Sequence, residues 1–88
     1  MYTIQWFSSA DQASIEQLKQ RFPQLRNAMT VQIQKDNRQW FVLVQGQYRN
    51  SQEAIRALKM PSMKMIAMVL HPWTRPINSL KKLSIAAL

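Results

Sequence analysis

Hydrophobic and polar positions alternate with a period of two over residues 2–7, which predicts a β-strand. The period changes over residues 12–22, where apolar side chains recur at spacings of three and four and predict an amphipathic helix. The apolar positions of this helix are Ile15, Leu18 and Phe22. Ser9 or Asp11 can cap it, because their oxygens accept hydrogen bonds from free N–H groups. Pro23 ends the helix, since a proline disfavours helical geometry in the residue before it.

The same order of strand, polar turn and helix returns later in the chain. The residues that match at an offset of 40 are Ile4 with Val44, Gln5 with Gln45, Gln12 with Gln52, Ile15 with Ile55, Leu18 with Leu58 and Lys19 with Lys59. A duplicated strand–helix unit in so short a chain predicts an α+β domain of the ferredoxin/RNP-like βαββαβ type. We expect a four-stranded antiparallel sheet with its helices on one face. The other face would then be free, and we expect the function to lie there.

The remaining strands follow from local patterns. Residues 29–34 and 39–48 predict two strands joined by a tight turn over residues 35–38. The second of these strands is the most apolar and is expected at the centre of the sheet. Its Gly46 predicts a bulge or a close approach. Residues 72–77 predict a last strand at a sheet edge, because proline cannot donate to a strand ladder.

Three further amphipathic segments follow the central strand. Asn50 or Ser51 caps a second helix, which Pro61 ends, and residues 62–70 predict an extra short helix. Residues 78–88 predict either a C-terminal helix or a frayed tail. The positions expected to face inward are Ile55 and Leu58 in the first segment, Met65, Met68 and Val69 in the second, and Leu80, Leu83 and Ala87 in the third.

The composition fits one small domain. The chain has 88 residues and no cysteine, so it holds no disulfide and no thiol metal site. Its longest apolar run, residues 65–70, is far too short to span a membrane. We expect residues 1–88 to be a single monomeric domain of a longer exported or membrane-anchored chain, whose signal or anchor lies upstream. The 12 Lys and Arg against 4 Asp and Glu give a net charge of +8, which favours an anionic partner or, more simply, a solubilising surface.

Candidate catalytic chemistry is sparse. His71 is the one histidine, the four acidic residues are separated, and neither a Ser–His–Asp arrangement nor a glycine-rich phosphate loop is present. A metal site would need more histidines or clustered acids. The sequence therefore predicts a non-enzymatic binding module without a cofactor or metal.

The sheet residues predict what such a module could bind. If Ile4, Val42 and Val44 point into the core, the free face carries Thr3, Gln5, Gln45 and Gln47 together with Phe7, Phe41 and Leu43. Amides and aromatic rings suit a sugar, although an ordinary solvated face, or one covered by a C-terminal helix, remains an alternative. Trp6 has core parity, as does Trp40 unless a bulge intervenes. Trp73 lies between prolines at an edge, where a partly exposed ring could contact a ligand.

Several segments together resemble the SPOR domain, a bacterial peptidoglycan-binding module. Residues 2–5 and 8–9 resemble its opening strand and turn. Residues 40–48, followed by residues 51–54, are similar to its central strand and the entry to its second helix. Residues 72–77 resemble most closely the subgroup found in cell-division proteins. The similarity covers nearly the whole chain and departs from the family pattern at Trp6-Phe7 and Gln47.

The resemblance implies a βαββαβ fold that binds glycan strands lacking stem peptides, in the periplasm at the division septum. By position, Gln5, Ser8 and Trp73 match family residues implicated in septal targeting, and Trp40 matches another that either contacts the ligand or supports the fold. Gln45 and Gln47 complete the predicted glycan-binding set. Other division proteins are further candidate partners.

The rival interpretation is a single-stranded nucleic-acid-binding domain of the RNP type. The predicted topology is the same, and sheet aromatics can stack on bases. The positive charge favours this interpretation, whereas the central strand lacks the basic, glycine and aromatic pattern of such domains. A third possibility is a protein-interaction domain that uses the sheet edge near Pro76 or a helix surface. Among these, the glycan-binding module is the leading prediction and nucleic acid the less favoured partner.

Overall fold

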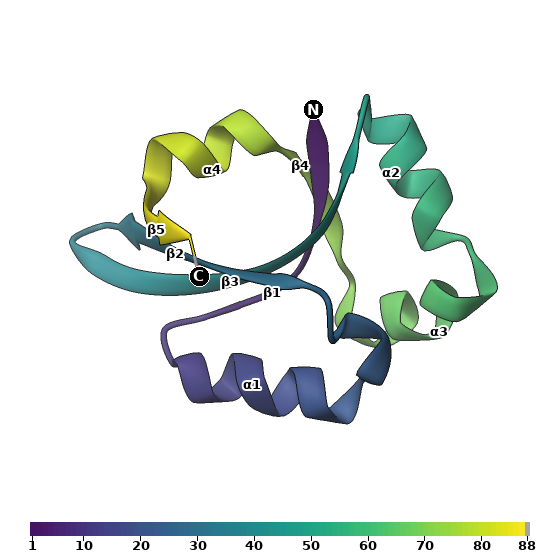
Figure 1. Ribbon diagram of the computed structural model, residues 1–88, viewed down its shortest axis with the longest axis horizontal. Helices are drawn as coiled ribbons and strands as arrows, with labels where there is room; N and C mark the ends of the chain where they lie inside the picture. The colour runs from purple at the N-terminus through teal and green to yellow at the C-terminus, as the bar shows by residue number, and fades with distance from the viewer. Residues whose placement is uncertain (88) are drawn as a thin grey trace.

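A computed structural model describes the backbone of residues 1–87 and the side chains of residues 1–80. Its elements are β1 (Tyr2–Ser9), α1 (Gln12–Arg21), the 3-10 helix η1 (Pro23–Leu25), β2 (Met29–Lys35), β3 (Arg38–Tyr48), α2 (Ser51–Leu58), α3 (Pro61–Leu70), β4 (Trp73–Pro76), α4 (Ile77–Leu83) and β5 (Ser84–Ala87) (Figure 1). The predicted βαββαβ order, with an extra short helix and a C-terminal helix, is confirmed. None of the helices described is both long and apolar enough to cross a bilayer.

The strands form one sheet in the order β4-β1-β3-β2-β5. Each pair of neighbours is antiparallel, which confirms the predicted four-stranded antiparallel sheet over β4-β1-β3-β2. The proline-containing β4 lies at an edge beside β1, as predicted. The tail differs from expectation, because its helix ends at Leu83 and β5 then pairs with β2. The predicted inward positions Leu83 and Ala87 lie outside the described side chains.

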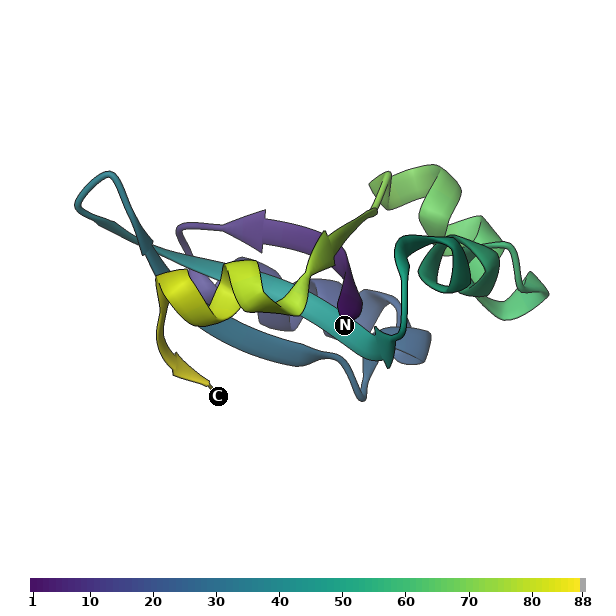
Figure 2. The same cartoon turned by 90° about the horizontal axis from the view of Figure 1, so that it is seen from above.

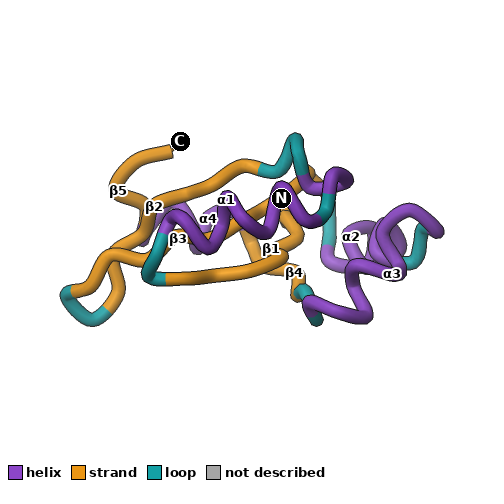
Figure 3. Tube along the Cα trace, turned by 90° about the horizontal axis from the view of Figure 1, so that it is seen from below, coloured by secondary structure: helices purple, strands orange, loops and turns teal. Residues whose placement is uncertain are grey.

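Helices α1, α2 and α3 pack against one face of the sheet, as predicted. The buried residues of this first core are Ile4, Trp6, Ile15, Leu25, Ala28, Leu43, Ala54 and Ile66. They come from β1 and β3, from all three helices and from η1 with the loop that follows it. Trp6 is 1% exposed, which confirms its predicted core position. Figure 3 shows α1 on the near side of the sheet and α4 behind it.

The predicted buried faces of α2 and α3 are wrong in part. Ile55, Met65, Met68 and Val69 are exposed by 45%, 76%, 69% and 56%. Ala54 and Ile66 are the buried residues of these two helices instead, and the predicted Leu58 packs at the edge of the first core. The physical reason in α3 is composition: the helix is apolar on most of its circumference, so spacing alone does not select the face that is buried.

The second face of the sheet is partly covered, which corrects the prediction of a free face. Four valine and isoleucine side chains of β2 and β3 form a second core with Leu80 of α4: Val31, Ile33, Val42 and Val44. Trp40 packs against this cluster and is partly buried. Because β4 and β5 lie at opposite edges of the sheet, α4 crosses this face between them (Figure 2). The C-terminal helix therefore covers the middle of the face where function was expected.

Two bulges decide which side chains share a face. Between the pairs Gln5–Val44 and Phe7–Leu43, β1 holds one extra residue, Trp6. Between the pairs Tyr2–Tyr48 and Ile4–Gln45, the extra residue lies on β3 at Gly46-Gln47. Gly46 has a φ of +82°, and a side chain there would meet the Tyr48 ring at 2.7 Å, so the predicted bulge and close approach are confirmed.

The strand register and the Trp6 bulge together overturn the grouping expected from the sequence. Ile4 pairs with Gln45 and Gln5 pairs with Val44, so Ile4 and Val44 point to opposite faces. Ile4 lies on the first face with Leu43, Phe7 and Phe41, whereas Val42 and Val44 lie on the second. The predicted grouping of Ile4 with Val42 and Val44 is therefore wrong, as is the predicted placement of Phe7, Phe41 and Leu43 on the free face. The inserted Trp6 reverses the parity of Phe7, whereas the faces of Ile4, Phe41 and Leu43 follow from the register of β1 against β3.

Candidate functional site

The second face is hollowed near both ends of β3, on either side of the region that α4 covers. One hollow of about 450 Å³, which we name the Trp73 cleft, is lined by Gln5, Ser8, Ile33, Lys35, Asp36, Trp40, Val42, Trp73 and Arg75. The other, of about 420 Å³, is lined by Thr3, Asn27, Met29, Val31, Val44, Gln45, Gly46, Gln47, Ile77 and Leu80, and we name it the Met29 groove. Both volumes lie in the range of ligand-binding pockets.

The Trp73 cleft brings together four of the six predicted site residues: Gln5, Ser8, Trp40 and Trp73. Gln5 lies directly opposite Trp73 in the β1–β4 pair. Ser8 lies opposite Val42 in the β1–β3 pair and is exposed. Residues three apart on a regular strand point to opposite faces, so the Trp6 bulge is what brings Gln5 and Ser8 to the same cleft.

The floor of the cleft is polar and ordered. Gln5 is 8% exposed, and its Oε1 accepts a hydrogen bond of 2.6 Å from Nη1 of Arg75. Nε of Arg75 donates to Oγ of Ser79 at 3.0 Å, and that hydroxyl donates to the carbonyl of Pro76 at 2.6 Å. Since the Gln5 oxygen is engaged by Arg75, its NH2 group is the end suited to donate to a ligand.

An exposed indole forms the wall of the cleft at β4. Trp73 is 51% exposed, which confirms its predicted partial exposure. The Cζ atom of Arg75 lies 5.1 Å from the centroid of the Trp73 ring, within the range of a cation–π contact. This contact and the two hydrogen bonds fix the guanidinium beside the ring. Burial lowers the pKa of Arg75, whose guanidinium nevertheless stays charged at neutral pH.

A smaller hollow continues the cleft around the Trp73 ring. Its volume is about 270 Å³, and its lining includes Gln5, Ser8 and Trp73 together with Leu70 and His71. The Trp73 cleft and this smaller hollow share Gln5, Ser8 and Trp73 in their linings, so the Trp73 ring borders both. Such an arrangement suits a ligand longer than a single ring.

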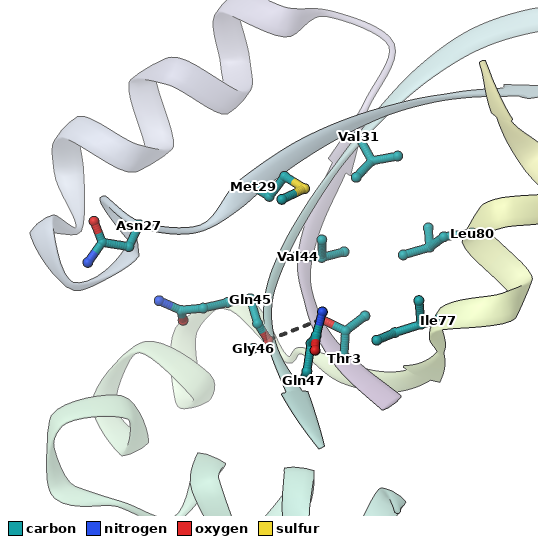
Figure 4. A pocket seen from close by; sticks show the side chains of 10 residues that line it. All are labelled: Thr3, Asn27, Met29, Val31, Val44, Gln45, Gly46, Gln47, Ile77 and Leu80. Atoms are coloured by element: carbon teal, nitrogen blue, oxygen red, sulfur yellow. Dashed lines mark hydrogen bonds between the residues drawn. The ribbon is translucent and has the colours of Figure 1, made fainter. Parts of the chain in front are cut away.

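The other two predicted residues lie elsewhere. The side-chain amide of Gln45 accepts a bond of 3.0 Å from Nε1 of Trp6 and donates to the carbonyl of Gln24 at 3.3 Å. Figure 4 shows this amide pointing away from the apolar side chains of the Met29 groove. Gln47 is exposed and lines the same groove. Neither glutamine lines the Trp73 cleft.

The sequence prediction did not include Arg75. Strand alternation over 73–76 puts Arg75 on the same face as Trp73, so the signal was present in the pattern. Its burial to 9% exposure could not be read from the sequence, because a charged residue beside a proline at a sheet edge is usually solvated.

Comparison with known proteins gives one informative match. No family model matches the chain. The chain is 31% identical over 81 residues to the cell division protein DamX of Serratia marcescens. The match covers 92% of this chain and 36% of DamX, so the chain spans about a third of that relative's length. With the SPOR-like motifs and the confirmed fold, this match supports a SPOR-like domain close to DamX.

Proposed function

We propose that this domain binds the glycan strands of peptidoglycan, preferentially strands without stem peptides, and thereby targets its parent protein to the division septum. The match to a protein named for cell division supports a division-related role. The role is one of binding rather than catalysis. The parent protein would present the domain in the periplasm, from a membrane anchor or after export.

The observation that carries this proposal is the convergence of Gln5, Ser8, Trp40 and Trp73 on one open cleft. The NH2 group of Gln5 and the hydroxyl of Ser8 would bond sugar hydroxyls and N-acetyl groups. The exposed face of Trp73 would stack on the C–H face of a sugar ring, since an indole offers a large apolar surface. The two hollows around this ring would take neighbouring sugars of one strand.

Nucleic acid fits the same face less well. RNP-type domains stack bases on aromatic side chains of the two central strands. Here the central strands contribute Gln5, Ser8 and Val42 to the cleft, together with the partly buried Trp40. Helix α4 also crosses the face where a bound single strand would run. A sugar chain in the Trp73 cleft avoids that helix, because none of the described α4 side chains lines the cleft.

The proposal is tested by sedimentation of the purified domain with cell walls, before and after an amidase removes the stem peptides. We expect amidase treatment to increase binding. Trp73→Ala should reduce binding about tenfold, since it removes an apolar contact surface. Met65→Ala, which truncates an exposed side chain of α3 remote from the cleft, is the matched control and should bind as the native domain does.

Two results would count against the proposal. The first is binding of amidase-treated walls no better than that of untreated walls, and the second is equal binding by the Trp73 and Met65 variants. In dividing cells, a fluorescent fusion of the domain should form a midcell band. Gln5→Ala and Trp73→Ala should lose that band while the purified variants keep the native far-UV circular dichroism.

A further inference from the structure

Arg75 lies at the floor of the Trp73 cleft as a buried cation. Its guanidinium is held by a hydroxyl and an amide oxygen, those of Ser79 and Gln5, and both groups are neutral. Buried charges in proteins are usually paired with an opposite charge, because neutral partners offset only part of the cost of leaving water. Among the described side chains, the hydrogen bonds of Arg75 provide no such anion.

The charged residues that line the cleft are positive in excess, which favours an anionic ligand. Lys35 adds a second positive group to the lining, and Asp36 adds one negative group from the turn between β2 and β3. Both residues are exposed, whereas Arg75 is 9% exposed. A guanidinium carries more N–H donors than the two used by Ser79 and Gln5, so donors remain for a planar anion.

We propose that Arg75 binds a carboxylate of the ligand, and that this carboxylate is the lactyl group of a muramic acid residue from which the stem peptide has been removed. This inference rests on the proposed function. In intact peptidoglycan the lactyl carboxyl is joined to the peptide by a neutral amide bond. Hydrolysis of that bond adds water, releases the amine of the peptide and leaves a free carboxylate on the sugar.

The chemistry explains how the cleft would tell the two forms of the strand apart. A strand with stem peptides offers Arg75 an amide that carries no charge, followed by a bulky chain. A strand without them offers a carboxylate, which accepts charge-assisted hydrogen bonds of about twice the usual strength from a guanidinium. The selectivity for bare strands would therefore come from recognition of a newly exposed charge, in addition to relief of steric exclusion.

The ligand side provides the first test. Soluble glycan oligosaccharides from amidase-treated walls are compared with the same oligosaccharides after their lactyl carboxylates have been converted to methylamides. Calorimetry on the native domain should give affinity at least about tenfold lower for the methylamide, because a charge-assisted pair is lost. Equal affinities for the two would overturn the role of Arg75 while leaving glycan binding intact. Failure to bind either oligosaccharide would instead refute the proposed function.

The protein side provides the second test. Arg75→Met removes the charge while keeping an unbranched side chain, and it should bind the free acid and the methylamide with affinities equal to within about twofold. Arg75→Lys keeps the charge and should retain part of the preference. Thermal unfolding of both variants checks that they fold. If Arg75→Met does not fold, the comparison of the two ligands on the native domain still tests the inference. A folded Arg75→Met that keeps the full preference for the free acid over the methylamide would overturn it.

Discussion

Gln5 and Gln45 hold equivalent positions in the sequence repeat and occupy opposite faces of the sheet. Gln5 lies at the floor of the Trp73 cleft with its oxygen bonded to Arg75. Gln45 faces the first core, where its amide oxygen accepts the N–H of the buried Trp6. A buried indole N–H without an acceptor is costly, so Gln45 supports the fold.

This difference predicts the effects of replacing Gln45 and Gln47, the two predicted site glutamines that lie outside the Trp73 cleft. Gln45→Ala should lower the free energy of unfolding by about 1–3 kcal/mol, because Trp6 loses its acceptor inside the protein. Gln47→Ala is the matched control and should change it by less than about 0.5 kcal/mol, since Gln47 is exposed. Urea unfolding followed by tryptophan fluorescence measures both. Equal stabilities of the two variants would show that Gln45 has no such role.

At the scale of elements, α3 shows where hydrophobic periodicity loses its meaning. Lys64 is the only charged residue in its sequence, so several helical faces look equally suited to burial. The fold selects the face of Ile66, which joins the first core with Ala54 of α2. The methionines Met65 and Met68 are left on the outside.

Substitutions on the two faces of α3 should therefore differ sharply. Ile66→Ala should lower the free energy of unfolding by about 2–4 kcal/mol, because it opens a cavity in a packed core. Met65→Ala, one residue earlier on the same helix, should change stability by less than about 0.5 kcal/mol, since its side chain is 76% exposed. Chemical denaturation of the pair gives the measurement. A larger effect at Met65 than at Ile66 would restore the stripe predicted from the sequence.

The strands were predictable to within a few residues, but the side chains that share a face were not. Alternation from Ile4 through Gln5 fails at Trp6, because the inserted residue reverses everything that follows it on β1. Gly46 gave a visible signal of the second bulge, whereas Trp6 gave none. The clustering of Gln5, Ser8 and Trp73 could therefore be expected from resemblance to a family. The residue pattern alone would predict it only if the Trp6 bulge were already known.

At the scale of the whole molecule, the net charge of +8 is confined to a small body. The Cα radius of gyration is 12.5 Å, comparable to the screening length of about 8–10 Å at moderate ionic strength. Such a molecule attracts any polyanion at low salt, so binding measured under those conditions says little about specificity. The number of ion pairs formed in a complex is the quantity that separates the candidate ligands.

The salt dependence of affinity should report that number. For a glycan oligosaccharide whose carboxylate binds Arg75, the logarithm of the association constant should fall with the logarithm of salt concentration at a slope no steeper than about −1. Salt only screens this single ion pair, because the separated carboxylates of the glycan hold no condensed counterions to release. A single-stranded oligonucleotide with four or more phosphate contacts would give a slope of about −3 or steeper. Fluorescence titrations from 50 to 500 mM salt, on the order of a tenfold range, suffice to separate these slopes. Arg75→Met should bring the glycan slope close to zero. A steep slope with the oligonucleotide, combined with tighter binding than to the glycan at physiological salt, would favour the nucleic-acid interpretation of this face.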